Sequence, residues 1–565
     1  MHIGGLRTAL FSYLLAKRTG GQFILRIEDT DQKRLVYNAV TRLSEDLRWA
    51  GLPWDEGPEV GGRYGPYQQS HRKKIYQEHA NALLDDGTAY RCFCTPQSSG
   101  AGSATYVTSG CYQDCSRLLA SDSRARAEGS EQLFTVRLKQ PDDVRKRMYP
   151  DLIYGNIKRL KRSASPSAST DEDSGLDGAD TILMKSDGTP TYHFANVVDD
   201  HLMKITHVIR GTEWMASTPL HYDLYHAFGW KPPVFAHVGL LLDKDKAKLS
   251  KRNADLALDV RGLREDHGVL PETLCNFLAL QGWSNPRKSD VMTMDELVEN
   301  FDLKFTRGNT MVLMEKLWFL QKNHVQLRCE RVRNGEEHAL DDVLNHVVQE
   351  VERAYPDFAA DKSGTRLTDY CTSVLLADDK SYHNAAHFVE RNWYFFCSTE
   401  EVKTRRMTSA ASEPIPASDI DGLLRDLVST YDTTRSYADL PPDLRAKAPA
   451  KERRTTMERS AARIHASLDL LTWQRSVPST VNAKSIPFTE QACDTEAVAR
   501  SLVGEANAAD LVKNYKTWQK ALMRHLRWKL AAGTPGPGMD MVMVVLGYEE
   551  CCKRLGLTPE AGKEW

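Results

Sequence analysis

The sequence lacks an excess of charge of one sign, long apolar runs and a dense set of cysteines. Lys and Arg total 74 against 76 Asp and Glu, which leaves a formal net charge of −2. The basic excess common in nucleic-acid-binding proteins is therefore absent, although a local basic face can exist on a neutral protein. No apolar run reaches the roughly 18 residues that a membrane-spanning helix needs. We expect a soluble protein.

The 11 cysteines among 565 residues suit a reducing compartment better than a secreted disulfide framework. The length exceeds the roughly 250 to 300 residues at which single domains usually stop growing, so two to four domains are expected. Polar stretches of small residues at 163–180 and 403–418 are typical of a surface loop and of a linker or insertion.

The beginning of the chain alternates between helix and strand patterns. Leu6, Leu10 and Leu14 recur at helical spacing, and the glycines at 20–21 end this pattern. Phe23–Ile27 is a short apolar run, typical of a buried parallel strand. Such alternation indicates an α/β nucleotide-binding sheet, whereas amphipathic helices dominate after about residue 265. A strand would normally precede the first helix, and none precedes it here.

Two short motifs carry chemistry. His2-Ile3-Gly4-Gly5 stands directly before the first helix, where glycines let a phosphate approach free backbone N–H groups and a histidine can donate to its oxygens. Lys248-Leu249-Ser250-Lys251-Arg252 follows the apolar run Val238–Leu242, and its two lysines can hold a triphosphate. Taken singly, the first motif is an ordinary helix start and the second a solvated basic loop.

Together the motifs occur in the order typical of class I aminoacyl-tRNA synthetases, and the segments around them resemble the glutamyl-tRNA synthetases. The segments that carry this resemblance are Phe23–Asp31, Gly51–Pro58, Tyr67–Arg72, Asp187–Asp200 and Ile205–Trp214. The chain is identified as a member of this family, of the fungal mitochondrial type. The resemblance is dense from residue 1 to about 330 and recurs at Leu526–Trp528, with little to match in between.

The resemblance implies an α/β fold. A class I Rossmann-type catalytic domain would span 1–265 and hold an acceptor-binding insertion at about 78–180. A helical stem-contact region at 266–335 and an all-α anticodon-binding region at 336–565 would follow. The family begins with a strand and turn ahead of His2, whereas this sequence starts at Met1 inside that motif. We therefore expect a truncated sequence rather than a protein that folds without an inner strand.

The activity implied is that of a glutamate–tRNA ligase. ATP with Mg²⁺ would activate L-glutamate to glutamyl-adenylate, and the glutamyl group would pass to the 3′ end of tRNA(Glu) in mitochondrial translation; charging of tRNA(Gln) as well stays open. Because the glutamate carboxylate itself attacks the α-phosphorus, catalysis consists of positioning and charge stabilisation. The catalytic residues implied are His2, Gly4, Gly5, Lys248, Ser250 and Lys251, and those for ATP are His2, Glu213, Leu241 and Lys251.

For glutamate, the resemblance implies Glu28 at the α-amino group, Tyr192 and Asn196 beside the side chain, and Arg210. Arg210 has a physical argument of its own. A planar guanidinium offers a bidentate match to a carboxylate, which separates glutamate from glutamine. The alternative for Arg210 is a surface ion pair.

Four cysteines form two close pairs, Cys92 with Cys94 and Cys111 with Cys115. Four thiols so arranged fit a tetrahedral structural Zn²⁺ site, and some relatives bind zinc at this place. Reduced thiols without a metal are the alternative. Cys551 and Cys552 are adjacent and are expected to be structural.

Helical segments between about 450 and 530 are locally basic and are expected to contact tRNA through phosphates; a solvated helix face is the alternative for each residue. The basic residues are Lys451, Arg453, Arg454, Arg459, Arg463, Lys516, Lys520, Arg524, Arg527 and Lys529. The resemblance further implies a monomer in the mitochondrial matrix. The first 20 residues could imitate a transit peptide, but we interpret them as the catalytic helix.

Three other functions compete with this one. A non-catalytic tRNA-binding protein is a hypothesis of a different class, and it rests on the missing first strand. Glutaminyl-tRNA synthetases are the nearest enzymes, but they end in β-barrels whereas the last third of this chain has helical patterns. The glutamyl-queuosine type is excluded because it lacks a long C-terminal half.

Overall fold

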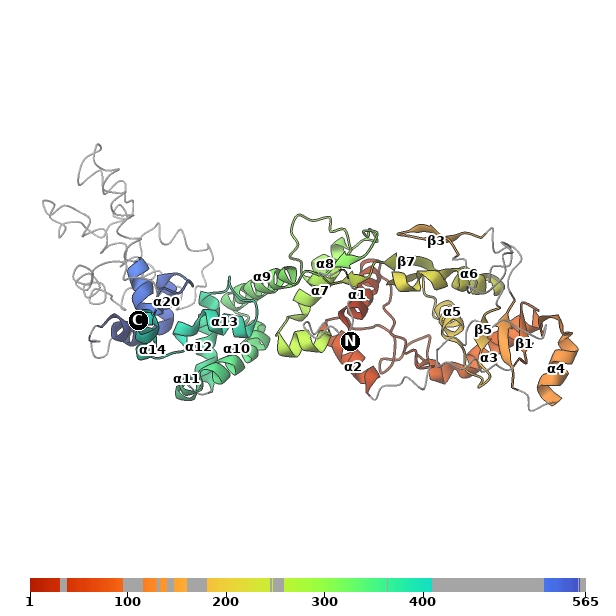
Figure 1. The fold of residues 1–565 in the computed structure, drawn as a ribbon, viewed down its shortest axis with the longest axis horizontal. Helices are drawn as coiled ribbons and strands as arrows, with labels where there is room; N and C mark the ends of the chain where they lie inside the picture. The colour runs from red at the N-terminus through yellow and green to blue at the C-terminus, as the bar shows by residue number, and fades with distance from the viewer. Residues whose placement is uncertain are drawn as a thin grey trace, which may run out of the picture. The chain divides into compact units, whose positions relative to one another are not determined.

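The computed structural model describes most of the first 408 residues and a helical segment near the C-terminus. The described ranges are 1–30, 38–94, 115–129, 133–139, 147–159, 180–243, 246, 259–362, 364–408, 523–556 and 558. The chain forms two compact units, Met1–Asp266 with Leu270–Leu320 and His267–Val269 with Gln321–Trp565. Helix α9 (Met314–Arg333) passes from the first unit into the second (Figure 1).

The first helix of unit 1 is the predicted one. Helix α1 spans Ile3–Arg18 and ends before Gly20, whose φ of +66° is accessible to glycine at no steric cost. It buries Leu6, Leu10 and Leu14. It packs against α7 (Pro271–Ala279), α8 (Met294–Asn300) and β6 (His207–Gly211). The leucine spacing therefore identified the buried stripe of this helix.

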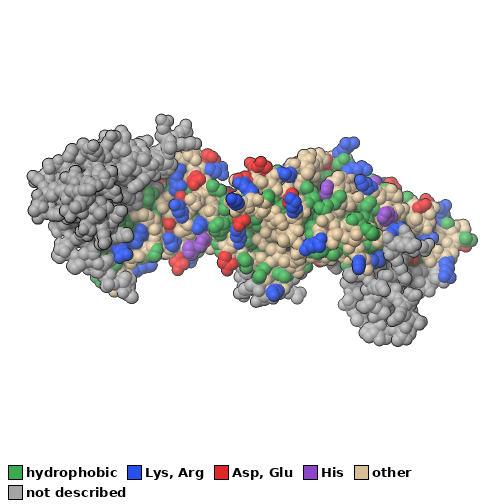
Figure 2. Space-filling view, turned by 90° about the horizontal axis from the view of Figure 1, so that it is seen from above, with side chains coloured by type: hydrophobic (Ala, Val, Ile, Leu, Met, Phe, Trp, Pro, Cys, Tyr) green, Lys and Arg blue, Asp and Glu red, His purple; other side chains and the backbone are tan. Residues whose placement is uncertain are grey.

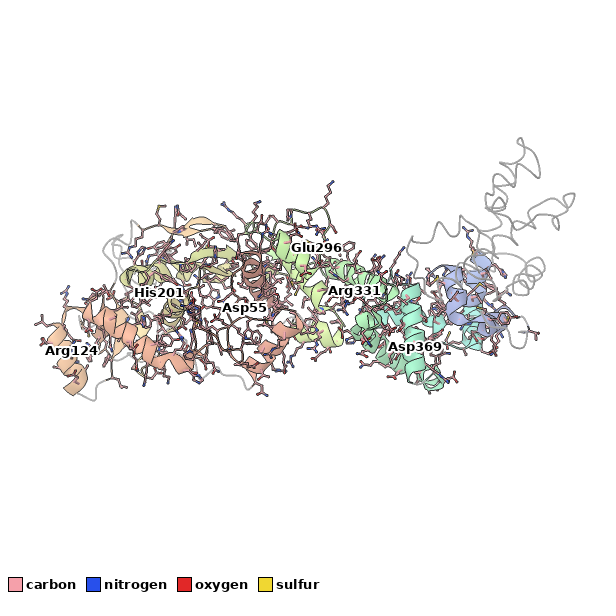
Figure 3. The ribbon with its side chains drawn as sticks, turned by 180° about the vertical axis from the view of Figure 1, so that it is seen from behind. Asp55, Arg124, His201, Glu296, Arg331 and Asp369 are labelled. Carbon is pink, nitrogen blue, oxygen red and sulfur yellow. The ribbon has the colours of Figure 1, made fainter. Side chains whose placement is uncertain are left out.

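The predicted strand at Phe23–Ile27 is wrong as a continuous element. Two isolated parallel bridges replace it, one from Ile24 to Glu56 and one from Ile27 to Gln68. The segment does not form a continuous ladder because its beginning pairs with the chain at Glu56 and its end pairs with the chain at Gln68, at one bridge each. Asp55 (Figure 3) joins the segment to α1 by accepting hydrogen bonds from the Lys17 ammonium and the Phe23 N–H, both at 2.7 Å.

A parallel strand pair forms the centre of unit 1. Strand β6 (His207–Gly211) pairs with β7 (Val234–Val238), so that Arg210 stands opposite His237. The connection between them holds the 3-10 helix η5 (Thr212–Ser217) and α6 (Thr218–Ala227). In parallel sheets of this kind ligands bind beyond the carboxyl ends of the strands, and Arg210 lies near that end of β6.

The remaining strands of unit 1 are antiparallel or very short. A three-stranded sheet has the order β1 (Ala89–Cys92), β2 (Thr135–Leu138) and β5 (Ile182–Met184), and β3 (Tyr149–Asp151) forms a hairpin with β4 (Gly155–Ile157). Strand β8 (Leu241–Leu242) pairs with β9 (Thr310–Met311) in parallel. The helical elements around them are α2 (Ala39–Trp49), η2 (Gln69–Arg72), α3 (Lys73–Asp85), η3 (Cys115–Arg117), α4 (Ala120–Gly129), α5 (Tyr192–Leu202) and the π-helix Gly262–Asp266.

One hydrophobic core runs through the antiparallel sheet and α5, α6 and β7. Its members include Tyr76, Leu83, Val136, Leu183, Phe194 and Phe235. At its margin the His201 ring, from the last turn of α5 (Figure 3), stacks on Trp230 with ring centroids 3.7 Å apart. The three-stranded sheet is thus packed into one core with α5 and α6.

Unit 2 is helical over its described residues, as predicted for the chain after about residue 265. Its elements are η7 (Glu337–Leu340), α10 (Asp341–Ala354), α11 (Pro356–Asp361), α12 (Thr365–Ala377), α13 (Ala385–Arg391), η8 (Trp393–Phe395), α14 (Thr399–Thr408), a helix at 523–531, α20 (Met539–Leu546) and α21 (Tyr548–Leu555). Arg554 of α21 is buried and donates to the carbonyl oxygens of Tyr394, Leu530 and Cys397. Arg554 therefore connects α21 by hydrogen bonds to the segment at 394–397 and to the helix at 523–531.

Charged side chains of both signs are scattered over the face shown in Figure 2, in agreement with the small net charge. None of the described helices combines the length and apolarity needed to cross a bilayer. Of the basic residues predicted to contact tRNA, Arg524, Arg527 and Lys529 lie within the described residues and the others outside them. Arg527 donates to the carbonyl oxygens of Thr534 and Pro537, so this side chain caps a turn within unit 2.

Candidate active site

The predicted motif His2–Gly5 caps the N-terminus of α1. His2 is the N-cap residue, and its Nδ1 accepts a hydrogen bond from the Gly4 N–H at 3.1 Å. Because Nδ1 is the acceptor, the neutral ring carries its proton on Nε2. The first turn holds no acidic residue of its own, and the carboxylate next to this end of the helix, that of Asp46, pairs with the Met1 ammonium.

A second group of predicted residues meets at the start of α5. Tyr192 is the first residue of this helix, and Asn196 follows one turn later. Asn196 Nδ2 donates to Glu28 Oε1 at 2.9 Å, and Arg26 Nη2 lies 3.0 Å from the same oxygen. Burial and the charge of Glu28, opposed by that of Arg210, raise the pKa of Tyr192 to about 12. Glu28, Tyr192 and Arg210 therefore lie within electrostatic reach of one another.

Glu28 is anchored through Arg26 to a buried network. Arg26 Nη1 pairs with Asp200 Oδ1 at 2.8 Å, and its Nε lies 3.8 Å from Asp199. Burial lowers the pKa of Arg26, but the surrounding carboxylates reverse the shift and leave the pKa raised. Burial likewise raises the pKa of Asp200 against the opposing effect of Arg26.

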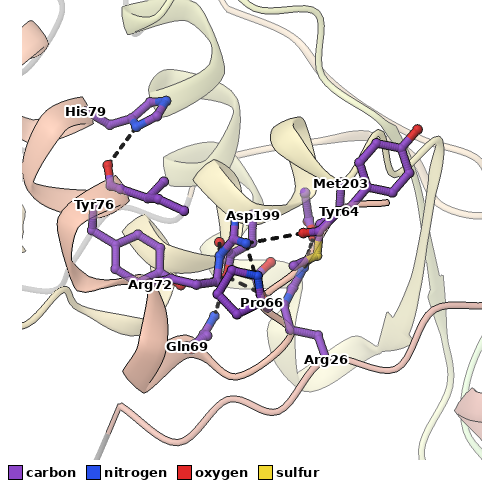
Figure 4. Close-up of polar contacts among 12 residues, drawn as sticks. Arg26, Tyr64, Pro66, Gln69, Arg72, Tyr76, His79, Asp199 and Met203 are labelled. Carbon is purple, nitrogen blue, oxygen red and sulfur yellow. Dashed lines mark hydrogen bonds and ion pairs between the residues drawn. The ribbon is translucent and has the colours of Figure 1, made fainter. Parts of the chain in front are cut away.

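Asp199 is the centre of this network and is shown in Figure 4. It accepts hydrogen bonds from Arg72 Nε at 2.7 Å, Gln69 Nε2 at 3.0 Å and the Tyr76 hydroxyl at 2.8 Å. All of these side chains are buried. The network holds α5 against η2 and α3 and so fixes the helix that presents Tyr192 and Asn196.

Arg210 is buried, with 8% of its surface exposed. Its Nε donates to His237 Nε2 at 3.0 Å, its Nη2 donates to Thr218 Oγ1 at 2.9 Å, and its guanidinium lies 5.2 Å from the centre of the Phe235 ring. Among the residues that the structure describes, no carboxylate is within ion-pair distance of Arg210. Burial lowers the pKa of Arg210, and Tyr192, Asp200 and Asp151 oppose this shift. A buried cation in this state favours an anionic ligand.

The alternative of a surface ion pair for Arg210 is therefore wrong. Its side chain lies beneath the surface because β6 directs it toward β7, where His237 and Thr218 accept its N–H groups. Sequence reasoning found Arg210 but missed His237, Thr218 and Asp151, which support it. No local pattern marks these residues, since 86 positions separate Asp151 from His237.

A pair formed by the half-buried His193 and the buried His221 lies beside Arg210. His193 Nδ1 and His221 Nε2 are 2.9 Å apart. Burial and, to a smaller extent, the charge of Arg210 together lower the pKa of His193 to about 4. Burial, Arg210 and His193 likewise keep the pKa of His221 well below its usual value. The pair is uncharged at neutral pH, so it adds no charge that would offset Arg210.

The residues predicted to bind ATP are described in part. Glu213 is in the first turn of η5, directly after β6, and Leu241 is buried in β8. Burial lowers the pKa of Arg7 on α1 to about 10, and the charge of Glu213 opposes this, so Glu213 lies near α1. Lys248, Ser250 and Lys251 lie outside the described residues.

Three of the four predicted zinc ligands converge. The sulfur atoms of Cys92, Cys94 and Cys115 all lie within 4.8 Å of one another, with Cys94 and Cys115 4.0 Å apart. A tetrahedral zinc with Zn–S bonds of about 2.3 Å holds its sulfurs roughly 3.8 Å apart, so these thiols fit such an ion. Cys111 lies outside the described residues, and no disulfide joins the cysteines of the described ranges. Cys551 and Cys552 are buried in α21.

Comparison with known proteins shows the family to which the chain belongs. The family of class I tRNA synthetases (E and Q), catalytic domain, matches residues 1–319. The mitochondrial glutamate–tRNA ligase of Schizosaccharomyces pombe is 38% identical over 438 residues, which are 77% of each chain. The corresponding protein of Saccharomyces cerevisiae is 39% identical over 407 residues, 70% of each chain.

A solved structure of a glutamate tRNA ligase is also similar to this chain. The glutamate tRNA ligase from Elizabethkingia meningosepticum, crystallised in complex with its amino acid, superposes with a TM-score of 0.62 at 26% identity. The match covers 98% of this chain and 96% of the bacterial one. The chain belongs to the class I tRNA synthetases for glutamate and glutamine, and within them to the glutamyl-tRNA synthetases. The predicted family, fold class and enzyme class are confirmed.

Proposed function

We propose that this chain activates L-glutamate with ATP and transfers the glutamyl group to the 3′ end of tRNA(Glu). The observation that carries the proposal is that a carboxylate, Glu28, and a cation, Arg210, both lie near Tyr192. Glu28 presents a carboxylate suited to an α-ammonium group, and Arg210 presents a buried cation suited to a carboxylate. A free amino acid with an acidic side chain satisfies both at once.

The chemistry needs no protein nucleophile. An oxygen of the glutamate α-carboxylate attacks the α-phosphorus of ATP, the bond to the bridging oxygen breaks, and pyrophosphate leaves with its electron pair. The start of α1 would stabilise charge on the phosphoryl oxygens, with the His2 Nε2–H as an additional donor. Lys248 and Lys251 are proposed to neutralise the leaving pyrophosphate. Mg²⁺ is expected to accompany ATP.

Arg210 would set the choice between glutamate and glutamine. A guanidinium donates two N–H groups to a carboxylate, whereas the amide of glutamine presents an NH₂ group that repels one of them. Because the hydrogen-bond acceptors on Arg210 within the described residues are neutral, a substrate anion would neutralise its charge. This preference is realised during binding and activation of the amino acid.

The division of labour along the chain is also proposed. The catalytic domain would span 1–265 with its insertion at about 78–180. The region 266–335 would contact the tRNA stem, and the region 336–565 would bind the anticodon.

Cys111 would complete a structural zinc site with Cys92, Cys94 and Cys115. Similarity to two fungal mitochondrial relatives supports mitochondrial translation. We also propose a monomer, with tRNA(Gln) as a second acceptor.

Glutamate-dependent ATP–pyrophosphate exchange, measured with tRNA present, tests the activity. We expect exchange with glutamate and none with aspartate. The Glu28→Gln variant should raise the KM for glutamate about 10- to 100-fold, the usual effect of losing a charged hydrogen bond. Glu59→Gln is the matched control, because Glu59 is an exposed carboxylate of the same unit that pairs with Arg48. tRNA binding without any exchange would favour the non-catalytic alternative.

A further inference from the structure

A chain of buried side chains leads from Arg210 away from the proposed substrate. His237 Nε2 accepts from Arg210 Nε at 3.0 Å, and His237 Nδ1 lies 2.6 Å from Asp151 Oδ2. The side chains of Asp151 and His237 are both 0% exposed. Asp151 also accepts the backbone N–H groups of Ile153, Tyr154 and His237 at 2.9 to 3.1 Å, so the position of its carboxylate is fixed.

The direction of the hydrogen bonds in this chain has one solution. A guanidinium donates and never accepts, so His237 Nε2 must accept from Arg210. The imidazole proton is therefore on Nδ1, and it is donated to Asp151. A neutral imidazole thus separates the carboxylate of Asp151 from the guanidinium of Arg210, and each partner fixes the orientation of the next.

This arrangement holds Arg210 without occupying the edge that a substrate would need. If a carboxylate paired directly with Arg210, it would compete with the substrate for the guanidinium. Asp151 lies one imidazole further away, so it compensates the charge of Arg210 more weakly than a directly paired carboxylate would. In agreement with this, Asp151 is one of the charges that raise the pKa of Arg210 against the effect of burial. The Arg210 Nη2 bond to Thr218 adds a second fixed point.

We propose that Asp151 is a positioning residue for recognition of the substrate side-chain carboxylate and acts through His237 on Arg210. Asp151 comes from the hairpin strand β3, which packs against β7. The inserted part of the chain therefore takes part in amino-acid selection. The inference rests on the proposed function, because it assumes that Arg210 binds that carboxylate.

The experiment compares Asp151→Asn with Asp223→Asn in the full chain. Asp223 is also a buried carboxylate of unit 1, but it pairs with Arg147 and Arg159 and does not contact His237. In ATP–pyrophosphate exchange we expect Asp151→Asn to raise the KM for glutamate about 10- to 100-fold and leave the KM for ATP within about twofold. Asp223→Asn should leave both within about twofold.

His237→Gln provides a second route. A glutamine oxygen can still accept from Arg210, but the link to Asp151 is broken, so the same selective rise in the KM for glutamate is expected if Asp151→Asn fails to fold. In an Arg210→Met background, His237→Gln and Asp151→Asn should add nothing further, because their effect passes through Arg210.

Two results would overturn the inference while the proposed function stands. The first is an active wild-type chain in which Asp151→Asn and His237→Gln raise the KM values for glutamate and ATP equally. The second is an additive effect of either substitution in the Arg210→Met background. A wild-type chain that shows no glutamate-dependent exchange would contradict the proposed function itself, and the two failures are therefore distinguishable.

Discussion

Two buried arginines of unit 1 lie in opposite electrostatic environments. Arg26 is surrounded by Glu28, Asp199 and Asp200, at distances from 2.8 to 3.8 Å. Arg210 contacts the neutral acceptors His237 and Thr218. Both side chains are largely buried and both contribute to the same group of residues, yet only one has its charge neutralised by the described part of the protein.

The difference separates a structural arginine from a binding arginine. The ion pairs of Arg26 stabilise the fold and hold Glu28, and an approaching ligand gains little from its charge. Arg210 is held by hydrogen bonds and by the face of the Phe235 ring, and the nearest carboxylate on its hydrogen-bonded chain, Asp151, reaches it only through His237. Its desolvation is therefore compensated only in part until an anion arrives. A buried arginine of this kind slightly lowers the stability of the fold and raises the affinity of the site for a carboxylate, which is common at functional sites.

The largest expected effect is that of Arg210→Met. Methionine fills much of the same volume, but it cannot bind a carboxylate, so kcat/KM for glutamate should fall by about 10⁴-fold. The free energy of unfolding should change by less than about 1 kcal/mol or even increase, because the substitution removes a buried charge that the protein compensates only in part. Pyrophosphate exchange and urea unfolding measure the two quantities. A large loss of stability would contradict a binding role.

Arg26→Met should give the reverse pattern. Its removal leaves the carboxylates of Asp199 and Asp200 with fewer partners, so the free energy of unfolding should fall by about 3 to 5 kcal/mol. Urea unfolding monitored by circular dichroism measures the loss. If Arg26→Met were as stable as the wild type, the proposed difference between the two arginines would be refuted.

The smallest effect concerns the pH dependence of stability. The pKa of His193 is about 4 in the folded state, below roughly 6.5 in the unfolded chain. The unfolded state therefore binds more protons between these values, and stability is present above about pH 6.5 and is lost as the pH falls toward 4. The charge that acts on this ring is that of Arg210, and the neutral ring of His221 lies 2.9 Å away.

In Arg210→Met the repulsion between the guanidinium and His193 disappears, so the pKa of His193 should rise. The loss of stability between pH 6.5 and 4 should then shrink by about 0.5 to 1 kcal/mol. Unfolding curves of both proteins at a series of pH values measure this change. An identical pH dependence would show that the charge of Arg210 is neutralised after all.

The fold could be predicted where local patterns decide it. Periodic leucines identified α1, and its glycine stop is at Gly20. The strand at Phe23–Ile27 was reduced to two bridges because pairing depends on the distant partners Glu56 and Gln68, which no local pattern reveals.

Of the candidate site, only the residues proposed to contact the substrate could be predicted from the sequence. Arg210, Tyr192, Asn196 and Glu28 were found through motif context, and the structure brings them together. Asp151 and His237 were missed, because an isolated aspartate and an isolated histidine carry no sequence signal and their contact joins two separate segments. The burial of Arg210 was also missed, since it depends on the strand pairing of β6 with β7.

The most direct test of the binding role of Arg210 is the ratio of kcat/KM for glutamate to that for glutamine, measured by pyrophosphate exchange with tRNA present. The account predicts a preference for glutamate of at least about 10³-fold in the wild type and of less than about tenfold in Arg210→Met, because the paired charge alone separates the two substrates. An unchanged ratio in the variant would show that another group selects glutamate, and the central claim would be wrong.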